Sequence, residues 1–124
     1  MPDYDCNKVW FSWIGFPRNT PIKDLPPVPT DGAFEIFLED SAGKFTGIHL
    51  VTKAALAGQC VPDPHHHMSF NRVEGITVFT YYGDITPDAA TGVLVARGTR
   101  RPIFLVDREI KLQDEDEWVA VKTT

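Results

Sequence analysis

The feature that most constrains this chain is a series of short runs rich in β-branched and aromatic residues, each followed by a turn-forming or charged segment. Such runs favour strands. They recur about every 8 to 15 residues, and the connections are too short for crossover helices. Neighbouring strands are therefore expected to be antiparallel, as in an all-β barrel or sandwich. The runs in the second half are 68–73, 76–82, 92–98, 102–107, 108–113 and 117–123.

The first half predicts a hairpin and an isolated first strand. "AFEIFLED" (33–40) alternates in polarity, "SAGK" (41–44) supplies a turn, and "FTGIHLVT" (45–52) returns. The first strand is "KVWFSW" (8–13), and "KAALAG" (53–58) resembles one turn of helix. The segments "GDITPDAATG" (83–92) and "TRRP" (99–102) are expected to break strands.

A proline-rich segment, residues 16–32, follows the first strand and holds five of the ten prolines. Proline fixes φ and lacks the N–H that a sheet needs, so we expect an extended loop. The loop could form a lid over a barrel mouth or a strap around the outside, and the strap is favoured.

These elements predict one domain over residues 1–124, a single antiparallel up-and-down barrel of about eight strands. Closure removes the exposed edges of a sheet. Most strands are apolar on both faces, which indicates extra burial: a lined cavity, a covering loop or a homodimer interface.

Charge excludes some partners. The net charge of −5 argues against nucleic acid and anionic membranes, which need basic patches. The one basic cluster, "RGTRR" (97–101), is interpreted as a solvated loop, and "DEDE" (114–117) as a solvated turn. The first residues hold no apolar stretch long enough for a signal peptide or a membrane span, and Cys6 and Cys60 fit free thiols, so we expect a cytoplasmic chain. An intramolecular disulfide is the alternative.

The segment "VPDPHHHMSF" (61–70) holds the strongest candidates for chemically active residues, because three of the four histidines are consecutive in it. In an extended segment His65 and His67 share one side, an arrangement that can place two imidazoles on a divalent metal such as zinc. His49, mid-strand, is the favoured third ligand; Cys60, Asp63 and Glu74 are others. The alternative is a polar loop without metal, and no cofactor is predicted firmly.

The same residues allow a metal-free interpretation. His49 or His67 could act as a general base, since imidazole titrates near neutral pH. Arg72 or a tyrosine of the pair 81–82 could orient an anion or a phenol.

Three features resemble the calycin superfamily, the lipocalin-like and avidin-like barrels: "NKVWFSW", which places Trp10 in an early strand, "GKFTGIHL", and the closing "DEDEWVAVKT". In lipocalins a first-strand Trp packs under a basic side chain from near the end of the barrel. The resemblance implies that Trp10 and Lys122 form this pair. It departs from the lipocalin motif at Lys8, where the motif has glycine.

The leading functional prediction is binding of a small, largely apolar organic molecule in the barrel cavity, held by Trp10, Trp13, Arg72 and Tyr82. The first alternative is an isomerase, cyclase or lyase that uses His49 and His67. The second is a homo-oligomeric interaction module.

Overall fold

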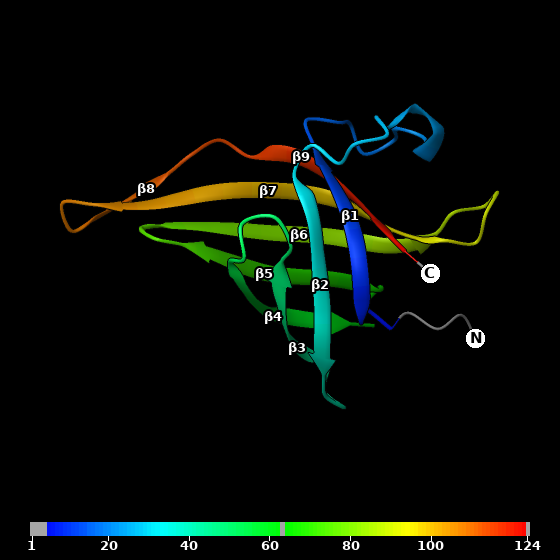
Figure 1. The fold of residues 1–124 in the computed structure, drawn as a ribbon, viewed down its shortest axis with the longest axis horizontal. Helices are drawn as coiled ribbons and strands as arrows, with labels where there is room; N and C mark the ends of the chain where they lie inside the picture. Colours follow the sequence, from blue (N-terminus) through cyan, green and yellow to red (C-terminus); the bar gives the residue numbers. More distant parts are fainter. Residues whose placement is uncertain (1–4, 63, 124) are drawn as a thin grey trace.

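The computed structural model describes residues 5–62 and 64–123, and its strands form one closed antiparallel barrel (Figure 1). The order β6-β5-β4-β3-β2-β1-β9-β7 closes through a β6–β7 pairing, and β8 adds to the other edge of β7. The strands are β1 (Lys8–Ile14), β2 (Gly32–Glu39), β3 (Lys44–His49), β4 (Ala55–Val61), β5 (His67–Glu74), β6 (Thr77–Pro87), β7 (Leu94–Val106), β8 (Glu109–Leu112) and β9 (Asp116–Lys122). The predicted all-β, up-and-down barrel of eight strands is confirmed, with one extra strand.

Three local predictions are wrong. The segment predicted as a helical turn contributes to β4, because Leu56 and Cys60 point inward while Ala55 and Ala57 point outward, a period of two. The expected break at 99–102 lies inside β7, where Pro102 pairs with Phe79 and uses its carbonyl rather than an N–H. The strand predicted at 76–82 likewise continues to Pro87, so only the second half of the predicted 83–92 break is a turn.

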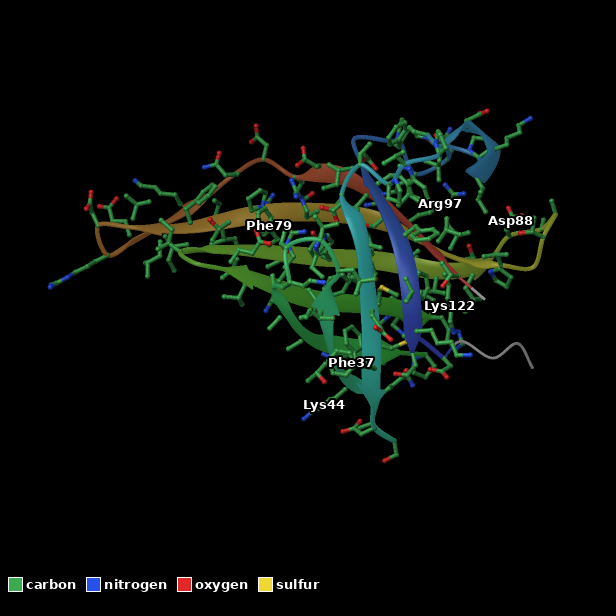
Figure 2. All side chains as sticks on the ribbon, viewed as in Figure 1. Phe37, Lys44, Phe79, Asp88, Arg97 and Lys122 are labelled. Atoms are coloured by element: carbon green, nitrogen blue, oxygen red, sulfur yellow. A yellow bond between two sulfur atoms is a disulfide. The ribbon has the colours of Figure 1, made fainter. Side chains whose placement is uncertain are left out.

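The proline-rich segment is a strap on the outside of the barrel, as favoured from the sequence. It includes a short 3-10 helix, η1 (Ile22–Asp24). Its Pro26 carbonyl accepts a hydrogen bond from the Trp13 indole at 3.0 Å, and the Arg18 and Thr20 carbonyls accept from Arg97. Figure 2 shows Arg97 beside this strap. The side chain of Trp13 faces outward from the barrel, and the strap covers it and keeps it buried.

Aromatic side chains make up much of the buried interior. Phe34, Phe70, Tyr81 and Trp118 lie with ring centroids 4.5 to 6.2 Å apart, and Trp10 stacks on Phe34 at 6.3 Å. A Cβ at Gly83 would lie 2.7 Å from the Trp118 ring, so glycine is needed there for this packing.

The two ends of the barrel differ. The end where β2 begins, called the Asp31 end, carries the strap terminus and the β7–β8 hairpin. The opposite end, called the disulfide end, carries the bond between Cys6 and Cys60 and the histidine segment. The expectation of free thiols is therefore wrong for this structure.

Within the described residues no helix is long and apolar enough to cross a membrane.

Candidate functional site: a buried charged network at one barrel end

Asp31 lies at the centre of a buried polar network. It is the last residue of the strap before β2, and its side chain is only 5% exposed. Its Oδ2 accepts hydrogen bonds from the Ser12 hydroxyl at 2.8 Å and the Tyr81 hydroxyl at 3.0 Å. Strands β1 and β6, on opposite parts of the barrel, are thus joined through one carboxylate.

Two arginines complete the network. Arg72 Nη1 lies 3.3 Å from Asp31 Oδ1, and Arg100 Nη1 lies 3.7 Å from the same oxygen. Each arginine has a second acid: Glu74 for Arg72 at 3.5 Å, and Asp116 for Arg100 at 3.1 Å. Because both guanidinium groups are paired with carboxylates, the network tolerates burial.

Both guanidinium groups also lie over the ring of Phe79, at 4.2 Å for Arg72 and 4.8 Å for Arg100 (Figure 2 labels Phe79). Cations are attracted to the electron-rich face of an aromatic ring. The ring therefore holds the two arginines beside each other at the Asp31 end.

Burial raises the pKa of the Tyr81 phenol well above its usual value, and the Asp31 charge adds to the rise. Tyr81 is thus a neutral hydrogen-bond donor at physiological pH.

Two buried donors, on Trp118 and Arg100, lack acceptors. No protein atom within the described ranges accepts a hydrogen bond from the indole N–H of Trp118 or from Nε of Arg100, whereas Nε of Arg72 faces Glu74 Oε1 at 3.5 Å. Trp118 is fully buried, and its ring lies 5.2 Å from that of Tyr81. The N–H groups of the other two tryptophans are bonded to carbonyls, so Trp118 differs from them.

His49 has a structural role in this geometry. Its Nε2–H donates to the Asp31 carbonyl at 2.8 Å, and its Nδ1 accepts from the Thr52 N–H at 3.2 Å. Both nitrogens of the buried ring are therefore engaged with backbone, which leaves neither nitrogen available to a metal or a substrate.

The structure does not bring His49 together with His65 and His67. The pairing of β3, β4 and β5 places His49 at the level of Glu74, seven residues along β5 from His67. That separation is about 23 Å at the rise of a strand. The predicted ligand set is thus divided between the two barrel ends.

The histidine segment forms a separate cluster on the outer rim of the disulfide end. His65 Nε2 lies 2.7 Å from Asp84 Oδ1 and 3.2 Å from the Tyr82 hydroxyl. His67 donates through Nδ1 to the His65 carbonyl at 2.8 Å and stacks on Tyr82 at 5.4 Å. Burial and the Asp84 carboxylate raise the pKa of Tyr82.

The other candidate third ligands are placed differently. Glu74 pairs with Arg72 at the Asp31 end, and Asp63 lies outside the described residues. Cys60 lies beside Cys6 and Glu39, and these three residues are the only described group whose potential ligand atoms converge. Both sulfurs are bonded to each other, so they are not thiolates and do not form a metal site.

The four residues predicted to hold an apolar ligand also do not share one space. Trp10 and Arg72 point into the barrel, whereas Trp13 faces the strap and Tyr82 faces the rim. Sequence reasoning missed Asp31 and Arg100, the central members of the network. Asp31 lay in the segment predicted as a proline-rich loop, and Arg100 in the cluster interpreted as a solvated loop.

No protein-family model, no curated protein and no solved structure matches this chain. The fold and the site alone define the class of protein: an eight-stranded up-and-down barrel with a charged network at one end.

Proposed function

We propose that this barrel binds a small, largely apolar organic molecule that presents a hydrogen-bond acceptor to the Asp31 end of the interior. The apolar contacts would come from the aromatic rings beside Tyr81, and the polar contacts from the donors next to the network. Ligand sites commonly combine aromatic walls with a few placed polar groups.

The observation that carries this proposal is the indole N–H of Trp118, buried and without an acceptor. An unpaired buried donor costs about 1–3 kcal/mol. A carbonyl or carboxyl oxygen of a ligand would remove that cost. Nε of Arg100, also buried and without an acceptor among the described residues, is a further donor.

Matched ligand pairs test this proposal. Tag-free protein is titrated with acetophenone and with ethylbenzene, which lacks the oxygen, and binding is followed by calorimetry and by native mass spectrometry. We expect the ketone to bind at least about fivefold more tightly, the lower limit for one satisfied buried donor. Equal affinity for the two compounds, or binding of neither, contradicts the proposal.

Two tryptophan variants supply the control. Trp118→Phe removes the N–H but keeps an aromatic ring, so the preference for the ketone should disappear. Trp13→Phe changes a tryptophan under the strap and should leave the preference intact. Loss of the preference in both variants would assign it to general destabilisation.

A second function is favoured by the pair of His65 and Asp84. The carboxylate engages Nε2 of His65, and the His65 carbonyl engages Nδ1 of His67, so each ring keeps one nitrogen for a divalent metal. Such outer contacts fix the tautomer of metal-binding histidines. Zinc calorimetry should show binding lost in His65→Gln and kept in His49→Gln; loss in His49→Gln would instead restore the three-histidine hypothesis.

Membership of the calycin superfamily remains a proposal with two supports. The β1–β9 register sets Trp10 directly opposite Lys122, the pair that the resemblance implied. Lys8, where the lipocalin motif has glycine, adopts a φ of 96°, which glycine adopts at lower cost than other residues.

A cytoplasmic location is also a proposal, and it depends on the redox state of the cysteine pair Cys6 and Cys60. Disulfides persist in oxidising compartments and are rare in the cytosol. Because Cys6 and Cys60 are bonded in this structure, the free thiols on which the expectation rested are not present.

A further inference from the structure

Strand β8 is the open edge of the sheet. With β7 it forms a hairpin that projects beyond the barrel (Figure 1). Within the described part of the chain β8 pairs only with β7, and all four of its residues are exposed. Ile110 and Leu112 are 70% and 60% exposed, and Leu105, opposite Ile110 on β7, is 55% exposed. Edges of this kind are templates for pairing with another chain.

The hydrogen-bonding pattern determines which β8 residues face the open edge. Asp107 and Arg108 form a two-residue turn in which both φ angles are positive, and Gln113 donates its N–H to Pro102. In a hairpin of this type the odd-numbered β8 residues bond to β7. Ile110 and Leu112 therefore direct their N–H and C=O groups outward.

We propose that β8 pairs with β8 of a second copy of this chain, antiparallel about a twofold axis through Ile110. Ile110 of each copy would exchange both backbone hydrogen bonds with its counterpart. Glu109 of each copy would then stand opposite Lys111 of the other, in the closely spaced non-hydrogen-bonded positions. Glu109 and Lys111 already lie on one face of β8, with their charged atoms 2.8 Å apart.

Charge selects this register over its neighbour. Moving the axis to Lys111 keeps the backbone pattern but sets the two lysines directly opposite each other. Like charges at opposed positions destabilise a strand pair. A lysine at an edge usually discourages pairing, but here the glutamate two residues earlier makes the sequence Glu-Ile-Lys self-complementary when antiparallel.

Apolar contacts add to the pairing. Ile110 of one copy would contact Ile110 of the other, and Leu105 would flank them on the same face. The partner at this edge is thus a second copy of the chain. The same short segment supplies the backbone groups, the charges and the apolar side chains of both partners, as a twofold interface requires.

A charge-swap series tests the proposal by sedimentation velocity from micromolar to near-millimolar protein. The wild type should form a species of twice the 13.9 kDa chain mass. Glu109→Lys and Lys111→Glu should each raise the dimer dissociation constant at least about tenfold, because two attractive pairs become repulsive. The double variant restores opposite charges and should restore the dimer.

Lys44→Glu is the matched control for Lys111→Glu, since it makes the same change in net charge on an exposed residue at the disulfide end (Figure 2 labels Lys44). It should leave the dissociation constant unchanged. A wild type that stays monomeric, or a double variant as weak as the single ones, overturns the proposal.

Carbodiimide cross-linking of the wild type gives a measurement that needs no variant. In a mixture of ordinary and nitrogen-15-labelled chains, a mixed-label peptide that joins Glu109 to Lys111 supports the register. Cross-links confined to one label would count against it.

Discussion

Replacing both Cys6 and Cys60 by alanine should lower the free energy of unfolding by about 4 kcal/mol. The bond joins residues 54 positions apart, so it closes a long loop in the unfolded chain. In the chain-entropy model the stabilisation rises with the logarithm of loop length, and a loop of this size gives about 4 kcal/mol at 25 °C. Most of the effect thus arises in the unfolded state rather than from contacts at the disulfide end.

The change should be visible as a shift in melting temperature. A chain of 124 residues has an unfolding entropy near 0.26 kcal/mol/K at its midpoint, from the average of about 2.1 cal/mol/K per residue. A loss of about 4 kcal/mol then lowers the midpoint by about 15 °C.

Urea unfolding of three samples measures the effect: oxidised wild type, wild type in reductant, and the double alanine variant. The reduced wild type and the variant should agree with each other and lie below the oxidised protein. If all three unfold at the same urea concentration, the loop-closure argument is refuted for this chain. A thiol titration that finds two free cysteines in purified protein would refute the bond itself.

Three further predictions follow from single contacts. Asp31→Ala removes the acid shared by two buried arginines and should cost about 3–5 kcal/mol in urea unfolding; a loss below about 1 kcal/mol would show that the network is not a buried ion-pair system. Burial raises the pKa of Glu39, so its ionised form costs stability above that pKa. Glu39→Gln should therefore melt higher than wild type at neutral pH, and the gain should vanish as the pH falls towards 4.5; a gain independent of pH would contradict this sign. Replacing Asp107-Arg108 by Asn-Gly suits the two positive φ angles of the turn and should raise stability by up to about 1 kcal/mol, and unchanged melting would argue against strain there.

Strand propensity and alternation predicted the barrel, because most pairs of consecutive strands are joined by a short turn with its own local signal. The hairpin of β2 and β3 is an example, with its turn at Gly43. The failures lie where packing overrides propensity. Alanines on the outer face of β4 favour a helix in isolation, but inward Leu56 and the pairing with β3 and β5 make it a strand.

The candidate site was harder to predict than the fold. Ser12, Asp31, Arg72 and Arg100 come from four separate segments, and no spacing in the sequence relates them. Arg100 belongs to a cluster of three arginines. Only the alternation of side chains along β7 shows that Arg100 is the one that points into the barrel. Only the closed sheet brings these residues together.

The seam between β1 and β9 has a consequence for how the chain folds. It pairs Trp10 with Lys122, more than one hundred residues apart, whereas each other neighbouring pair on the barrel wall is closer in sequence. Closing so long a loop is slow, because the chain loses conformational entropy before the stabilising contacts of the seam form. The hairpins are expected to form early and the seam late. The charged network, which joins Ser12 of β1 to Arg100 of β7 through Asp31, is then complete only after closure. A molecule that binds this end would bind the closed barrel alone, and it would slow the reopening of the seam.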